Sequence, residues 1–293
     1  MQTVLVTGGA GFLGQEVIRA LLATGRPVVA TWYSKPPVAG ESRVVWRRAD
    51  LTTAGALDAL PQVNAVCHLA ATLPSAGTSQ ERAAGHNRQI DENLIAFSRE
   101  RGLPTVYASG TMVYGLSDAE DVPVTEERTP EPPGPYLAEK VWAEQQGRAQ
   151  LNAFSVLRIC APYGPRQAAR SVLPIFLERA LRKEPLLYHG TGSREQTFTF
   201  SSDIGNAFVR ALEGPPGTYN IAGPSPITMR ELARMIARSA GLEETYARPS
   251  GQTDAQEGVL ARFDTGLARR ALGWRPEVEL ELGLARCLEV NFT

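Results

Sequence analysis

The chain has 293 residues, of which 43% are hydrophobic and 21% charged, with 30 basic residues against 31 acidic ones. The formal charge of −1 offers no basic surplus to neutralise a phosphate backbone, so we expect no nucleic-acid partner. The apolar content excludes a disordered chain and is enough for one large domain or two unequal ones. The sequence has no run of about 18 apolar residues and no basic leader, so we expect no membrane partner and a cytoplasmic location.

The cysteines and histidines give no sign of a metal site or a disulfide bond. Cys67, Cys160 and Cys287 show no Cys-x-x-Cys spacing, and the three histidines are scattered along the chain. We therefore expect neither a metal nor a disulfide. Lysine is rare, at positions 35, 140 and 183, so a lysine at a particular position is informative.

The first part of the chain, residues 1–162, alternates short β-branched runs with amphipathic stretches. It begins with the run 4–6, continues with apolar residues at helical spacing from Phe12 to Leu22, and reaches a natural helix stop at Gly25. Further strand-like runs occupy residues 28–30, 44–46, 65–69 and 105–107, and helix-like stretches lie around 54–60 and 79–101. Buried strands that alternate with helices predict a parallel sheet covered on both faces.

After about residue 162, prolines and glycines separate shorter elements. We expect an α/β protein with a Rossmann-like, doubly wound parallel sheet in a dinucleotide-binding domain, residues 1–162. A segment near 196–222 is expected to return to this domain. The remainder of residues 163–293 is expected to form mainly a smaller mixed α/β lobe that binds substrate. Ligands then belong in the crevice at the carboxyl ends of the strands.

A glycine-rich turn follows the first predicted strand, in the segment Thr7-Gly8-Gly9-Ala10-Gly11-Phe12-Leu13-Gly14. Gly8 permits the tight turn, Gly11 lets the backbone approach a pyrophosphate, and Gly14 lets the helix pack closely on the strand. The N-terminus of the following helix faces the anion. The position of the turn at the first strand–helix junction favours a dinucleotide site over an ordinary turn.

A tyrosine and a lysine four residues apart, Tyr136 and Lys140, follow Pro135 in a segment with helical propensity. This spacing places both side chains on one face of the helix. An ammonium group beside a phenol favours the phenolate, which makes a tyrosine a usable acid or base when a hydride enters or leaves an adjacent carbon.

The chain resembles the extended short-chain dehydrogenase/reductase family, which includes nucleotide-sugar epimerases, dehydratases and ketoreductases. The resemblance rests on the spacing G-x-x-G-x-x-G, on the Tyr136 and Lys140 pair, and on further segments in order over nearly the full length. These segments are Asp50-Leu51, His68-Leu69-Ala70-Ala71, Asn87, Leu157-Arg158, Asp203 and Leu272-Gly273-Trp274-x-Pro276.

The resemblance implies which residues contact the cofactor. Asp50 and Leu51 would contact adenine, and the segment from Leu69 to Ala71 would run beside the cofactor. With the glycine turn, the end of the second strand and the tyrosine–lysine pair, the expected cofactor-binding residues are Gly8, Gly11, Phe12, Leu13, Gly14, Trp32, Ser34, Lys35, Asp50, Leu51, Leu69, Ala70, Ala71, Asn87, Tyr136 and Lys140.

The choice between NAD and NADP depends on the end of the second strand, where an acid would accept hydrogen bonds from the ribose 2′-OH. Trp32 stands where NAD-using relatives carry that acid, while Ser34 and Lys35 are placed to meet a 2′-phosphate. NADP is therefore favoured over NAD. In the alternative, Trp32 stacks on adenine and Lys35 is a solvated charge.

Relatives usually add a serine or threonine that bonds the substrate oxygen, and the matching position here is Gly110. We favour Thr111 as its replacement, with Ser109 second, and name Tyr136, Lys140, Thr111 and Ser109 as candidate catalytic residues. Dehydratase members also need an acid pair just after that hydroxyl. Thr111 and Met112 stand there, so a 4,6-dehydratase is disfavoured.

The substrate-binding residues depart further from the resemblance. Relatives that bind nucleotide diphosphates tend to carry an asparagine where this chain has Ala161 and an arginine where it has Gln196. Arg166 and Arg194 lie nearby in sequence and would suit a phosphate clamp, although each is also explained as a solvated charge. Our candidate substrate-binding residues are Arg166, Arg194 and Gln196.

The leading hypothesis is an NAD(P)-dependent oxidoreductase that transfers a hydride at the carbinol or ketone carbon of a sugar or nucleotide sugar. A ketoreductase is slightly favoured over an epimerase with tightly bound NAD. A protein that senses NADP(H) without catalysis is the alternative from another functional class. The resemblance also implies a homodimer formed through the helix with Tyr136 and the helical stretch around 79–101.

Overall fold

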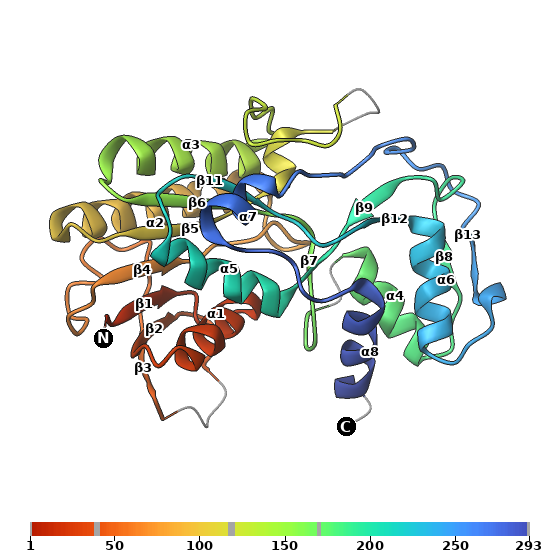
Figure 1. The fold of residues 1–293 in the computed structure, drawn as a ribbon, viewed down its shortest axis with the longest axis horizontal. Coiled ribbons are helices and arrows are strands. Elements are labelled where there is room, and N and C mark those ends of the chain that lie inside the picture. The colour runs from red at the N-terminus through yellow and green to blue at the C-terminus, as the bar shows by residue number, and fades with distance from the viewer. Residues whose placement is uncertain (1, 38–41, 117–120, 169–170, 292–293) are drawn as a thin grey trace.

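The computed structural model describes residues 2–37, 42–116, 121–168 and 171–291 (Figure 1). A parallel sheet of seven strands, in the order β11-β6-β5-β4-β1-β2-β3, forms its larger part. The strands are β1 (Val4–Thr7), β2 (Val28–Trp32), β3 (Val44–Arg48), β4 (Ala65–His68), β5 (Thr105–Gly110), β6 (Phe154–Ile159) and β11 (Thr218–Ile221). The strand order reverses direction between β1 and β4, which is where a doubly wound sheet opens a crevice for ligands.

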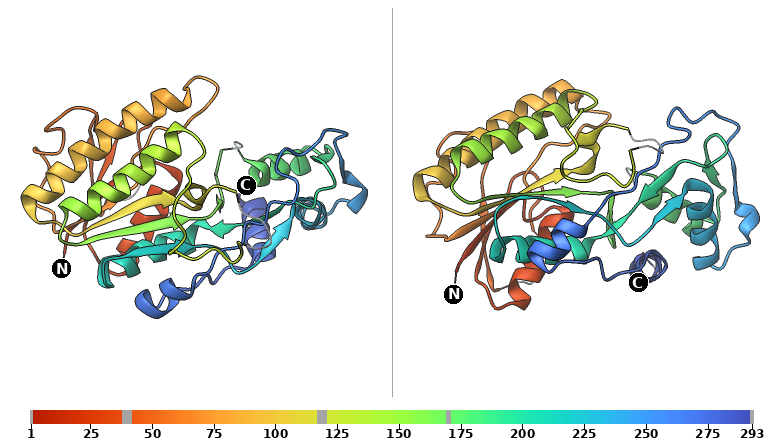
Figure 2. Two further views of the ribbon diagram at one scale, coloured as in Figure 1. Left: turned by 90° about the horizontal axis from the view of Figure 1, so that it is seen from above. Right: turned by 45° about the horizontal axis from the view of Figure 1, so that its top comes forward.

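Helices cover both faces of this sheet (Figure 2). One face carries α2 (Gln80–Arg101) and α3 (Pro135–Gln150), which lie side by side. The other face carries α1 (Phe12–Ala23), α5 (Ser201–Glu213) and α7 (Gly266–Leu272). The prediction of a Rossmann-like, doubly wound parallel sheet is confirmed.

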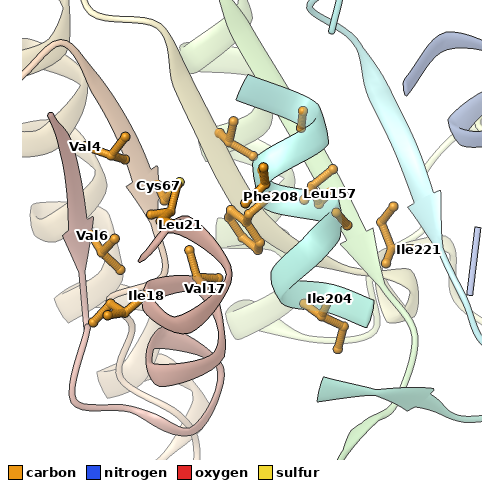
Figure 3. Packing of buried hydrophobic residues seen from close by; sticks show 14 of the residues in the cluster. Val4, Val6, Val17, Ile18, Leu21, Cys67, Leu157, Ile204, Phe208 and Ile221 are labelled. Atoms are coloured by element: carbon orange, nitrogen blue, oxygen red, sulfur yellow. The ribbon is translucent and has the colours of Figure 1, made fainter. Parts of the chain in front are cut away.

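Alternate residues of each strand supply two separate cores, one on each face of the sheet. In β1, Val4 and Val6 pack with Val17 and Leu21 of α1 (Figure 3), whereas Leu5 lies in the core beneath α2. This follows from the two-residue period of side-chain direction along a strand. A strand that is buried on both faces needs apolar residues at every position, and the runs in the sequence have this property.

A smaller lobe lies beyond the carboxyl ends of the sheet strands, as Figure 1 shows, and has an apolar core of its own. Its helices are α4 (Val172–Leu181), α6 (Met229–Ser239) and α8 (Leu280–Asn291). Its short strands pair two by two: β7 (Pro162–Tyr163) with β10 (Thr199–Phe200), β8 (Leu186–Tyr188) with β13 (Ala247–Pro249), and β9 (Glu195–Thr197) with β12 (Pro226–Thr228).

Two details differ from the sequence expectations. The stretch around residues 54–60 forms a series of turns rather than a helix, and Gly55 there has the left-handed φ of +76°. Residues of the C-terminal part also return to the sheet region beyond the segment 196–222, because α7 packs against β11 and places Trp274 in the sheet core. No helix in the described ranges is long and apolar enough to cross a membrane.

Candidate active site

The glycine turn between β1 and α1 is built entirely from backbone and leaves no room for side chains. Gly8 has a φ of +66°, and a Cβ on it would lie 2.9 Å from the Cα of Ala70. A Cβ on Gly14 would lie 2.3 Å from the carbonyl oxygen of Gly8. The turn closes with a 2.9 Å bond from the Gly11 N–H to that same oxygen. These close approaches explain why positions 8 and 14 are glycine.

The N-terminus of α1 is open to an anion. Gly11 is its N-cap and supplies no side chain to bond the first N–H groups, and the first turn contains no acidic residue. Unpaired N–H groups and the positive end of the helix dipole therefore face the turn. A backbone cradle of this kind fits the pyrophosphate of a dinucleotide. Phe12 and Leu13 begin the helix beside it.

The segment after β4, residues 69–71, borders the glycine turn and is held from two sides. The hydroxyl of Thr7 accepts hydrogen bonds from the N–H groups of Leu69 and Ala70, both at 3.2 Å. The side-chain amide of Asn87 accepts from the N–H of Thr72 at 2.7 Å and donates to its carbonyl at 3.0 Å. Asn87, a predicted cofactor residue, is 1% exposed. Its side chain holds this segment by bonding the backbone of Thr72.

The ends of β2 and β3 form the edge where the adenosine half of a cofactor is expected. Trp32 ends β2 half-buried, and the guanidinium of Arg48, at the end of β3, lies 5.7 Å from the centre of its ring. Ser34 and Lys35 are exposed just beyond. Arg48 was not among the residues expected from the sequence, although β2 and β3 are adjacent parallel strands in which Trp32 and Arg48 are direct partners.

Asp50 and Leu51, the expected adenine contacts, follow β3 in a loop. The Asp50 carboxylate accepts hydrogen bonds from the hydroxyl of Thr52 at 2.7 Å and from its N–H at 3.0 Å. These bonds hold the pKa of Asp50 below its usual value, so it is ionised at neutral pH. Leu51 is buried, and its carbonyl accepts a 2.9 Å bond from Asn93 of α2, which fixes the loop against the sheet layer.

The tyrosine–lysine pair lies on α3, which begins with Pro135 at its first turn. Tyr136 is half-buried, while Lys140, one turn further, is 6% exposed. The Lys140 ammonium donates to the hydroxyl of Tyr107 at 3.0 Å and to the carbonyl of Ala108 at 3.1 Å, both in β5. The helix and the neighbouring strand together fix the position of the ammonium.

A chain of buried polar side chains continues from Lys140 into the sheet layer. The Tyr107 hydroxyl donates to Asp91 at 3.0 Å, and the other Asp91 oxygen lies 2.8 Å from Nε2 of His68. Nδ1 of His68 lies 2.6 Å from the hydroxyl of Thr7. Asp91 was not among the residues expected from the sequence, although it lies four residues after Asn87 on the buried face of α2. His68 entered the expectations only as part of the family resemblance.

The two candidate hydroxyls near Gly110 have different surroundings. Ser109 donates a 2.6 Å hydrogen bond to Glu144, which is itself paired with Arg158 at 2.6 Å in the interior. Thr111 begins a 3₁₀ helix (Thr111–Tyr114) and lines a pocket between the sheet region and the smaller lobe. Gly110 has an extended backbone, and a Cβ there would meet its nearest neighbour at 3.7 Å, so its lack of a side chain is not a steric requirement.

The pocket beside Thr111 also receives residues of the smaller lobe. Arg194 and Gln196 line it, as does the exposed Met112. Arg194 already makes an ion pair with Asp254 at 3.1 Å, and Gln196 donates to the Thr197 carbonyl at 3.2 Å. The structure therefore brings Thr111, Arg194 and Gln196 together across the crevice.

Arg166, the third candidate for substrate binding, is placed differently. It is exposed, it has a left-handed φ of +64°, and it does not contribute to the lining of this pocket. Within the described part of the chain, no group of three or more histidine, cysteine or acidic side chains is arranged to hold a metal ion. The groups present at the site are a half-buried tyrosine, a buried ammonium and a helix N-terminus without a side-chain cap.

The comparisons with known proteins agree with this geometry. Residues 4–222 match the model of the NAD dependent epimerase/dehydratase family. A UDP-glucose 4-epimerase of Mycolicibacterium smegmatis is 30% identical over 97% of this chain and 97% of its own length.

Two solved structures superpose over nearly the whole chain. A UDP-glucose 4-epimerase of Thermotoga maritima with UDP-glucose has a TM-score of 0.89, with 25% identity over 99% of this chain and 98% of its own. A dTDP-glucose 4,6-dehydratase of Streptomyces venezuelae with NAD bound has a TM-score of 0.87, with 27% identity over 99% and 97%. The predicted resemblance is confirmed, and the chain belongs to the NAD-dependent epimerase/dehydratase family of extended short-chain dehydrogenases/reductases.

Proposed function

We propose that this protein is an NAD(P)-dependent oxidoreductase that transfers a hydride at the carbinol or ketone carbon of a nucleotide sugar. The observation that carries this proposal is the pairing of half-buried Tyr136 with the buried, doubly hydrogen-bonded Lys140 on one helix. The two relatives with solved structures are an enzyme described with UDP-glucose and one that acts on dTDP-glucose, which supports the substrate class.

Each part of the site has a chemical role in this proposal. The bound dinucleotide supplies the hydride donor or acceptor, and the glycine turn with the open N-terminus of α1 holds its pyrophosphate. Tyr136 exchanges the proton with the substrate oxygen. Lys140 holds the ribose of the cofactor, and its positive charge stabilises the phenolate. Thr111, which lines the pocket at the crevice, orients the substrate oxygen, whereas Ser109 does not line this pocket and is bonded to Glu144.

An NADP-dependent ketoreductase is favoured at the level of the specific reaction. No acidic side chain stands at the end of β2, where Trp32 is found, and the cations Lys35 and Arg48 flank it. Cations at this edge suit a 2′-phosphate, and a reductase must exchange its cofactor after each turnover. The alternative is an epimerase that retains NAD, which is favoured by the two epimerase relatives and by the NAD in the dehydratase structure.

The first experiment extracts the purified protein under denaturing conditions and identifies the dinucleotide that is released. Protein without bound dinucleotide that then binds NADPH more tightly than NADH would support the reductase. Stoichiometric NAD would instead identify the epimerase and overturn our interpretation of Trp32 and Lys35. The expected homodimer is checked in the same preparation by light scattering.

The mechanism is tested with Tyr136→Phe, which removes one hydroxyl and keeps the ring. Because a positioned acid–base group contributes about 10²–10⁴-fold to rate, we expect turnover to fall by about that factor while cofactor affinity is unchanged. Undiminished turnover would refute the assignment of Tyr136. A protein that binds NADPH but turns over no member of a panel of nucleotide sugars and sugar ketones would support the sensing alternative.

A further inference from the structure

The buried polar chain that begins at Lys140 has one consistent arrangement of protons. The Lys140 ammonium donates to the Tyr107 oxygen, so the Tyr107 proton goes to Asp91. Since a carboxylate only accepts, Nε2 of His68 carries a proton toward Asp91. Nδ1 of His68 then accepts from Thr7, whose oxygen accepts the backbone N–H groups of residues 69 and 70. Every proton has an acceptor when His68 is neutral.

The charges along this chain also balance in pairs. All its members are buried: Thr7 is 0% exposed, His68 and Asp91 1%, Tyr107 2% and Lys140 6%. The two other buried acids near Lys140 have partners, since Glu144 is paired with Arg158 at 2.6 Å and Glu139 with Arg88 at 2.7 Å.

Among the ion pairs of the described residues in this layer, Asp91 is joined only to His68, which is neutral in this arrangement. The negative charge of Asp91 is therefore left to balance Lys140 across the Tyr107 hydroxyl. Burial, with Asp91 alongside, raises the pKa of Tyr107 well above its usual value, so the phenol keeps its proton and bridges the two charges. A buried ammonium without an opposite charge would carry a large desolvation cost.

We propose that Asp91 is a positioning residue for Lys140, holding the ammonium through Tyr107 in the orientation that the dinucleotide and Tyr136 require. This inference rests on the proposed function, in which Lys140 binds the cofactor ribose. It assigns a role to a residue on α2, a helix that contributes no group directly to the reaction.

The number of N–H donors on the ammonium shows what Asp91 controls. Lys140 has three N–H donors, of which Tyr107 and the Ala108 carbonyl accept two. The third is left for a ligand, and its direction is set by the other two bonds. His68 and Thr7 anchor Asp91 from the far side by linking it to β1 and β4. Without Asp91, the Tyr107 hydroxyl can turn and the third N–H loses its fixed direction.

The test measures dinucleotide binding to Asp91→Asn, Tyr107→Phe and Lys140→Met by titration with NADPH and NADH, and in parallel with ADP. ADP carries the half of the cofactor that the glycine turn holds and lacks the nicotinamide ribose. Because a hydrogen bond to a charged group is worth about a tenfold to hundredfold change in affinity, we expect Asp91→Asn and Tyr107→Phe to weaken dinucleotide binding at least tenfold. We expect ADP binding to stay within about twofold.

Ser98→Ala is the matched control. Ser98 lies two turns beyond Asp91 on the same helix and accepts a buried 3.1 Å bond from Thr105 in β5, so the variant breaks an equivalent contact away from Lys140. We expect it to bind dinucleotides like the wild type. Tyr107→Phe keeps the ring contact with Phe154 and so serves if Asp91→Asn does not fold.

The double variant Asp91→Asn/Tyr107→Phe shows whether Asp91 acts through Tyr107. If it does, the double variant binds no more weakly than the weaker single variant, since the same contact cannot be lost twice. Three outcomes would overturn the inference while the proposed function stands. The variants could lose as much affinity for ADP as for NADPH, or the losses of the two single variants could add up in the double variant. Asp91→Asn could also bind dinucleotides as tightly as Ser98→Ala. A wild type that binds no dinucleotide would overturn both. If the purified protein retains a dinucleotide, the variants are compared by the amount of dinucleotide retained per chain and not by binding affinity.

Discussion

The sheet region and the smaller lobe stabilise their charged groups in opposite ways. In the sheet region, Arg158 and Glu144 form an ion pair with side chains 3% and 1% exposed. In the smaller lobe, Arg262 pairs with Glu195 at 2.6 Å, yet the arginine is 44% exposed. Buried contacts therefore hold this charged pair of the sheet region, whereas the arginine of the pair in the smaller lobe remains exposed to solvent.

The carboxyl groups of the two regions show the same contrast in their pKa values. Burial raises the pKa of Glu139 on α3 to about 7 despite its contact with Arg88. Hydrogen bonds from Ser193 and Thr191 lower the pKa of the exposed Glu257 in the smaller lobe. The same residue type is thus penalised as an anion in one region and favoured in the other.

Breaking the buried ion pair should give the largest loss of stability. Arg158→Met leaves Glu144 buried without its main cation, and an uncompensated buried charge costs about 3–5 kcal/mol of unfolding free energy. Denaturant unfolding followed by circular dichroism measures the change. A loss below about 1 kcal/mol would mean that this buried pair contributes no more to stability than a surface pair. The contrast between the two regions would then be refuted.

The glycine turn gives the next effect, because its backbone contacts allow no added atom. In Gly14→Ala the new Cβ would lie 2.3 Å from the Gly8 carbonyl oxygen, so we expect a loss of about 1–3 kcal/mol and impaired dinucleotide binding. Gly85→Ala on α2 is the control, since a Cβ there meets nothing within 4 Å. The control should be stabilised by up to about 1 kcal/mol through helix propensity. Similar melting temperatures for the two variants would contradict the steric argument.

The raised pKa of Glu139 predicts a dependence of stability on pH. The folded protein holds this proton up to a pKa of about 7, whereas the unfolded chain releases it near the ordinary glutamate value of 4.5. The contribution is therefore complete below the unfolded value and is lost as the pH rises through the folded one, amounting to about 1 kcal/mol between pH 6 and pH 8. Glu139→Gln should remove this part of the slope in thermal unfolding curves. An unchanged slope would show that Glu139 is ionised throughout.

The smallest effect is expected in the smaller lobe. Arg262→Met removes an exposed ion pair, and exposed pairs contribute about 0–1 kcal/mol, so the unfolding free energy should change by less than about 1 kcal/mol. Raising the salt concentration should shrink even this difference. A loss as large as that of Arg158→Met would mean that burial does not separate the two regions.

Local patterns in the sequence were sufficient to predict the sheet, the glycine turn and the placement of the tyrosine and lysine on one helix. Each depends on residues within one strand, one turn or one helix, where spacing fixes which side chains share a face. The prediction of a helix around 54–60 was wrong because Gly55 and its neighbours form turns. The resemblance indicated a hydroxyl near Gly110, and the tertiary contact of Ser109 with Glu144 distinguishes it from Thr111.

The sequence by itself determined that this chain forms a doubly wound sheet with a dinucleotide cradle, because alternating buried strands and helices have few other ways to pack. The tertiary structure alone decided what surrounds Lys140. Thr7 and His68 are 61 residues apart, and Asp91 reaches Tyr107 only because α2 packs over β5. Such contacts depend on how elements are stacked, and no local spacing encodes them. Arg48 meets Trp32 for the same reason, since adjacent strands of a parallel sheet are joined by long crossovers.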